Sequence, residues 1–230
     1  MESFFLDSAF AGVSISLIAY MAGVFLKKKF KIGVFNPLLI SIIVTMVVLI
    51  AGKVDYESYN AGVKYLSWLL TPATVCLAIP LYEQIQLLKS NFAAIILGIA
   101  SGVATSLLTV LVLSMLMGLT HEQYVTMLPK SITTAIGMGV SEELGGYVTI
   151  TVAVIVVTGV IGNILAEFIC NVFKITEPIA KGVAIGTSAH AVGTAKAIEM
   201  GEIEGAMSSL SIAVAGILTV IGASVFANFL

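Results

Sequence analysis

Long apolar stretches alternate with short polar segments along the whole of this 230-residue chain. A helix that crosses a bilayer needs about 20 predominantly apolar residues. Stretches of about this length lie at 4–26, 34–51, 62–82, 91–118, 123–140, 147–173, 179–198 and 204–229. The pattern predicts an all-α integral membrane protein with seven to eight membrane segments.

Three of these stretches contain residues that interrupt helices. Pro72 and Pro80 lie in the third stretch, Pro129 and Lys130 in the fifth, and the seventh contains the polar run GTSAHAVGTAKA at 186–197. Broken helix at membrane depth is tolerated only where protein buries it or a water-filled cavity lines it. A simple proline kink explains the third stretch equally well, whereas the polar density of the other two favours a functional site.

The lysines leave two topologies open for the stretch at 123–140. If it crosses the membrane, Lys174 and Lys181 lie outside; if it re-enters, they lie inside, as the positive-inside rule prefers. With re-entry, the seventh stretch forms a second polar hairpin, and the two hairpins meet near the midplane, as in transporters with inverted repeats. A shift of 57 residues also weakly aligns 62–118 with 123–173, which predicts an inverted repeat.

Composition supports the membrane assignment and restricts the chemistry. Hydrophobic residues make up 59% of the chain and charged residues 10%, against about 25% charged in soluble domains. The net charge of −2 argues against a nucleic-acid partner. All 11 cationic side chains are lysine, which excludes bidentate arginine recognition of an anion. Cys76 and Cys170 lie in apolar stretches with no disulfide or metal pattern.

The motif MLPKSITTAIGMG at 127–139 is the first candidate anion site. Pro129 lies where it would occupy the first turn of a half-helix, whose free N–H groups attract anions. Lys130 adds a full positive charge, and Ser131, Thr133 and Thr134 add hydroxyl groups. The alternative is that Lys130 extends to the membrane interface and has no ligand.

The polar run at 186–197 is the second candidate site. A histidine inside a membrane segment usually faces a cavity or a partner, and its pKa suits proton coupling, which makes His190 a candidate. The alternative is a structural histidine that hydrogen-bonds a neighbouring helix. The predicted substrate-binding residues of this run are Thr187, Ser188, His190, Gly193, Thr194 and Lys196.

No enzyme signature accompanies these motifs. The chain has no metal-ligand cluster, G-x-S-x-G, H-E-x-x-H or phosphate-binding loop, so we expect no catalytic residues, no metal and no cofactor. The leading hypothesis is a secondary transporter of small monocarboxylates, which would explain two polar, lysine-bearing breaks. A pore-forming regulator is the alternative, and an intramembrane enzyme is the least favoured.

Two long motifs resemble those of the LrgB/CidB (YohK-like) family: LPKSITTAIGMGVSEELGG and GTSAHAVGTAKAIEMGEIEGAMSSLSIAVAGILTVI. FNPLLISIIV near residue 35 is similar to the family's early helix. The resemblance implies a multi-pass protein of the bacterial cytoplasmic membrane, linked to murein hydrolase control and cell lysis by a holin/antiholin-like role. It also implies transport, because a plastid relative is similar to a glycolate/glycerate translocator and some bacterial members are implicated in pyruvate uptake.

The sequence and the resemblance together give the expected organisation and partners. We expect one LrgB-like transmembrane domain over 1–230, with scaffold helices in 1–60 and a core with the broken segments in 61–230. The start MESFFLDSAF has no basic residue, which predicts a retained first helix and no cleaved signal peptide. The expected partners are a small organic anion, a second copy of the chain, and a smaller membrane protein of the LrgA/CidA type.

Overall fold

The structure of the chain is a computed structural model that describes residues 10–30, 35–76 and 78–230. The first residues of the predicted spans 4–26 and 34–51, and residue 77 within the predicted span 62–82, lie outside the described residues.

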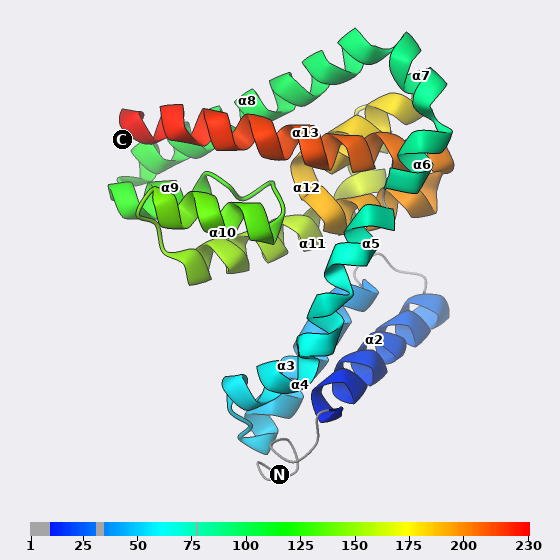
Figure 1. The fold of residues 1–230 in the computed structure, drawn as a ribbon, viewed down its shortest axis with the longest axis vertical. Helices are drawn as coiled ribbons and strands as arrows, with labels where there is room; N and C mark the ends of the chain where they lie inside the picture. Colours follow the sequence, from blue (N-terminus) through cyan, green and yellow to red (C-terminus); the bar gives the residue numbers. More distant parts are fainter. Residues whose placement is uncertain (1–9, 31–34, 77) are drawn as a thin grey trace. The chain divides into compact units, whose positions relative to one another are not determined.

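Every regular element of the described residues is a helix, which confirms the predicted all-α fold (Figure 1). In chain order the helices are α2 (Ala11–Phe30), α3 (Pro37–Gly52), α4 (Tyr56–Trp68), α5 (Leu70–Cys76), α6 (Ala78–Glu83), α7 (Ile85–Ser90), α8 (Phe92–Met117), α9 (His121–Met127), α10 (Thr134–Glu143), α11 (Val148–Val172), α12 (Pro178–Met200), α13 (Glu202–Phe226) and the 3-10 helix η1 (Ala227–Phe229).

Four helical segments of the described chain are long and apolar enough to cross a membrane: α2, α8, α11 and the continuous segment of α13 and η1. Helix α3 is apolar but shorter. The chain is therefore a multi-pass membrane protein. The finer count of seven to eight segments and the inverted repeat stay predictions.

The chain forms two compact units, residues 1–76 and 77–230. The first unit contains α2 to α5, and the second contains α6 to η1. The two predicted polar sites, the run 127–139 and the run 186–197, both lie in the second unit. The assignment of residues 1–60 to a scaffold stays a prediction.

The first unit is organised by close contacts of α2. Ser16 Oγ of α2 lies 2.7 Å from Tyr59 OH of α4, within hydrogen-bond distance. Farther along α2, Gly23 lets the helix pack closely against the start of α3. A Cβ added to this glycine would lie only 2.7 Å from the carbonyl oxygen of Pro37. Asn36 begins α3 as an N-cap, because its side-chain oxygen accepts two backbone N–H groups of the first turn at 2.8 and 3.2 Å. These contacts join α2 to α3 and α4.

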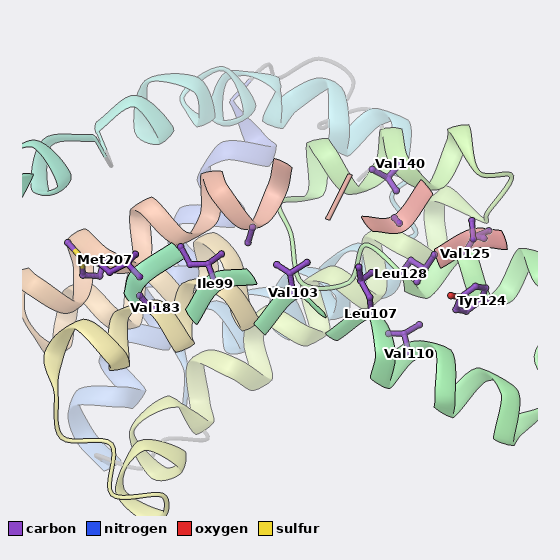
Figure 2. Close-up of a cluster of buried hydrophobic side chains, with 14 of the residues drawn as sticks. Ile99, Val103, Leu107, Val110, Tyr124, Val125, Leu128, Val140, Val183 and Met207 are labelled. Carbon is purple, nitrogen blue, oxygen red and sulfur yellow. The ribbon is translucent and has the colours of Figure 1, made fainter. Parts of the chain in front are cut away.

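Helix α8 forms the apolar centre of the second unit. Its buried side chains recur every three or four residues and so share one face. Figure 2 shows this row running into a cluster with α9, α10, α12 and α13. The buried row comprises Ile95, Ile99, Val103, Leu107 and Val110. The opposite faces of α8 are left free to contact lipid or to line a cavity.

Small residues allow three helices of the second unit to approach closely. A Cβ added to Gly102 of α8 would lie 2.7 Å from the Thr187 methyl group of α12, and Gly98 faces the preceding turn of α12. Gly182 and Gly186 of α12 face the backbone of α13 in the same way. These two glycine pairs, each spaced by four residues, are therefore packing contacts, and α8 and the first half of α12 run parallel.

All three stretches predicted to be interrupted are interrupted in the structure. The stretch at 62–82 is divided among α4, α5 and α6. The stretch at 123–140 contains α9 and α10, with the non-helical residues 128–133 between them. In α12 the dihedral angles leave the helical region at Ala189 (φ −130°, ψ 15°) and His190 (φ 42°, ψ −142°). Helix α12 therefore consists of two half-helices.

A buried polar cluster holds the connection between α9, α10 and α11. Thr151 Oγ1 is fully buried and lies 3.0 Å from the Thr126 carbonyl oxygen and 2.7 Å from Ser141 Oγ. The backbone N–H of Tyr147 donates to Thr126 Oγ1 at 2.8 Å. These buried polar groups form hydrogen bonds with one another. The turn between α10 and α11 can therefore lie against apolar helices without leaving these groups unpaired.

We expect the Thr151→Val variant to be less stable than the parent protein by about 1–2 kcal/mol, because the buried Ser141 hydroxyl loses its partner. Thr149→Val is the matched control, since Thr149 is exposed on the same helix. Thermal unfolding in detergent should separate the two variants by several degrees. Equal unfolding temperatures would show that the cluster does not stabilise this connection.

Candidate functional site

A cavity of about 820 Å³ lies among α8, the non-helical residues 128–133 and the first half of α12. One end is polar, because hydroxyl groups from all three elements gather around one lysine. The other end lies at the beginnings of α8 and α12, near Asn91 and Glu177. Apolar and glycine residues form the walls between the ends. The polar end comprises Thr105, Ser106, Lys130, Ser131, Thr187 and Ser188.

Lys130 provides the positive charge at the polar end. The side chain is half-buried, and its ammonium group donates a hydrogen bond to Ser131 Oγ at 2.9 Å. Ser131 Oγ in turn lies 3.3 Å from Ser106 Oγ of α8. Lys130 forms no salt bridge with any carboxylate of the described residues. An ammonium group in such a place is costly without an anion, which makes the cavity a candidate anion site.

Thr187 provides a hydroxyl group that lacks a partner. The residue is 6% exposed, and no described group forms a hydrogen bond with its Oγ1. Its methyl group packs against Gly102, which fixes the side chain beside α8. A buried hydroxyl without a partner costs about 1–3 kcal/mol, and a ligand that reached this atom and accepted its proton would recover this energy.

The structure brings together four of the ten predicted site residues. Lys130 and Ser131 come from the first motif, and Thr187 and Ser188 come from the second. Ser188 is exposed on the cavity side, and its hydroxyl group donates to the Ala184 carbonyl oxygen at 2.7 Å. The two motifs, far apart in the chain, therefore meet at one cavity.

His190 does not line this cavity. Its ring is buried against α11, with Nε2 3.0 Å from the carbonyl oxygen of Ile155. A Cβ added to Gly159 would lie 2.7 Å from the ring, so the glycine makes room for the imidazole. This arrangement is the structural alternative that the sequence left open, a histidine bonded to a neighbouring helix. His190 and Lys130, both predicted to bind the substrate, therefore do not line the same cavity.

Thr133 and Thr134 lie at the start of α10, outside the cavity lining. Thr133 is the N-cap residue, but its side chain makes no capping hydrogen bond. The expectation that Pro129 occupies the first turn of a half-helix is wrong, because α10 begins at Thr134. Turns at 128–131 separate Pro129 from the helix, and they place Lys130 beside α8.

The last three predicted residues lie in the second half of α12, away from the cavity lining. Gly193 is buried against its own helix at the kink. Thr194 is fully buried, and its Oγ1 lies 2.7 Å from Ser208 Oγ of α13. Lys196 forms a salt bridge with Glu167 of α11 at 2.7 Å. Packing and pairing within the protein account for the surroundings of all three.

Sequence reasoning missed the contribution of α8. The stretch at 91–118 has few interruptions and was expected to be a plain membrane span. Gly98, Gly102, Thr105 and Ser106 are spaced by three and four residues, which places them on one helix face. A polar face on an apolar helix is the signal that would have indicated this third wall of the cavity.

The fold and the cavity define a class: a multi-pass helical membrane protein whose broken segments surround a cationic cavity. The LrgB-like family model matches residues 16–229, and the chain belongs to this family, as its motifs predicted. It is similar to the antiholin-like protein LrgB of Bacillus cereus (strain B4264), with 39% identity over 220 residues, covering 95% of this chain and 96% of the relative. The antiholin-like protein LrgB of Bacillus anthracis (strain CDC 684 / NRRL 3495) matches with the same identity and coverage. No solved structure matches the chain.

Proposed function

We propose that this LrgB-family protein transports small monocarboxylates, such as glycolate, glycerate or pyruvate, across the bacterial cytoplasmic membrane. One observation carries the proposal: Lys130 lies in a cavity among hydroxyl groups and forms no salt bridge with a described carboxylate. Export or uptake of an organic acid changes cytoplasmic pH, which provides a link to murein hydrolase control and lysis.

The donors at the polar end fit a carboxylate that carries one further polar group. The Lys130 ammonium group supplies charge, and the Thr187 hydroxyl group supplies a donor with no competing partner. The hydroxyl groups of Ser106 and Ser131 lie next to each other in the cavity lining. They could form hydrogen bonds with the α-hydroxyl or keto oxygen of such an acid. Lysine binds anions as a point charge, so this site needs no arginine.

The relatives' name favours a second function, an antiholin-like regulator of a membrane lesion. A pore requires no ordered anion site, whereas a carrier does. Purified protein in proteoliposomes separates the two: saturable uptake of labelled pyruvate, glycolate or glycerate supports the carrier. Release of a large trapped dye without saturable uptake would support the pore instead.

Two further partners belong to the proposal. A second copy of the chain would give a small carrier a fixed surface against which to move, and an LrgA/CidA-type protein would add further membrane helices. Uptake by the purified protein alone, compared with uptake after adding such a protein, tests whether a partner is needed.

The Thr187→Val variant should bind carboxylate about tenfold more weakly while unfolding at the same temperature as the parent protein or a higher one. The valine has the same shape, and it removes a buried hydroxyl group that has no partner within the described residues. A structural threonine would show the reverse, with lower stability and unchanged affinity. Thr109→Val is the control, because Thr109 is exposed on α8 outside the cavity lining.

A further inference from the structure

The cavity is much larger than a two- or three-carbon acid requires. Its volume of about 820 Å³ falls in the range of pockets that hold drug-sized ligands, about 300–1,000 Å³. Along α12 it extends from Glu177 to Thr187, a rise of about 15 Å at 1.5 Å per residue. Lys130 is at the Thr187 end, so most of this length lies beyond the charged group.

The walls beyond Lys130 are apolar, and several of their residues are small. Ala94 and Gly98 of α8 face the space from one side, and Ala180 and Ala184 of α12 face it from the other. Ala94, Ala180 and Ala184 are exposed, so their small size leaves the space open. An occupant of this space would therefore combine a carboxylate at Lys130 with an apolar chain along the two helices.

We infer that the cavity binds monocarboxylates with an unbranched apolar chain, and binds them more tightly as the chain lengthens. The inference rests on the proposed function for the position of the carboxylate and extends the substrate class beyond glycolate, glycerate and pyruvate. Burying one methylene group in the apolar part of this cavity raises the affinity about fourfold. The gain continues until the chain reaches the end near Asn91 and Glu177.

The test is displacement of labelled pyruvate from the full-length protein in lipid nanodiscs by butyrate, hexanoate and octanoate. Each step adds two methylene groups, so we expect potency to rise about 16-fold per step in the parent protein. Ala184→Leu should abolish the rise, because the leucine side chain fills the apolar part of the cavity. Ala195→Leu is the matched control, since Ala195 is exposed on the same helix outside the cavity lining.

The outcomes separate this inference from the proposed function. Equal potency of all three acids, or the same rise in Ala184→Leu, would overturn the inference; a groove filled by lipid or by another helix would give this result. Saturable pyruvate uptake in proteoliposomes would still support the carrier. A length-dependent displacement without any uptake would support the ligand class and overturn transport.

Discussion

The Lys130→Met variant is expected to lose saturable carboxylate uptake while folding as well as the parent protein. Lys130 contributes the positive charge of the polar end, where its partners are the hydroxyl groups of Ser131 and, through it, Ser106. Removing one member of a desolvated, hydrogen-bonded charge pair costs about 2 kcal/mol or more, which corresponds to a loss of affinity of roughly 30-fold. Methionine keeps the length of the side chain and removes an ammonium group without a described carboxylate partner, so stability should not fall.

Lys89→Met is the matched control, because Lys89 is exposed in the last turn of α7 and does not line the cavity. This variant should transport carboxylate like the parent protein in the same proteoliposome assay. If Lys130→Met transports with an unchanged half-saturating concentration, then Lys130 does not bind the substrate. The anion site would then have to lie elsewhere in the chain.

Replacing His190 should give the largest change in stability. We expect the glycine variant to be more stable than the alanine variant, the reverse of the usual order within a helix. The residue has φ 42°, a conformation that favours glycine, and its ring Nε2–H donates a hydrogen bond to the Ile155 carbonyl oxygen. His190→Ala loses the ring contact and keeps the strained backbone, and we expect a loss of about 2–3 kcal/mol. His190→Gly loses the same contact but relieves the strain, so it should be more stable than His190→Ala by about 1 kcal/mol.

Thermal unfolding of the two variants in detergent measures this order directly. A lower unfolding temperature for His190→Gly than for His190→Ala would contradict the strained kink. The same variants also test the site. Because His190 does not line the cavity, the folded fraction of both should retain carboxylate affinity, whereas a substrate-binding or proton-coupling histidine would make both variants lose uptake.

Hydropathy predicted the long helices α2, α8, α11 and α13, because the thickness of the bilayer sets the length of an apolar helix. The sequence also located the breaks. Pro129 removes a backbone donor and ends α9, and the run at 186–197 contains the kink that separates two half-helices. Local chemistry accounts for the break at Pro129, whereas the kink at His190 is also held by the contact of its ring with α11.

The side-chain directions around the site depended on distant contacts and were not predictable from the sequence. The ring of His190 points to α11 because glycine at 159 leaves room there. Lys196 belongs to a salt bridge with Glu167, 29 residues earlier in the chain. The hydroxyl groups of Thr105 and Ser106 reach the cavity only through the rotation of α8, which its buried row fixes against α12 and α13.

The most direct test of the anion site is the protection of one cysteine by substrate. Ser188→Cys introduces a thiol on the exposed cavity wall, in a background where Cys76→Ser and Cys170→Ala remove the native thiols. A carboxylate bound at Lys130 predicts that pyruvate slows modification of this thiol by a charged reagent, and that Lys130→Met abolishes the protection. Modification at the same rate with and without saturating pyruvate, or equal protection with lysine and methionine at position 130, would contradict a carboxylate site in this cavity.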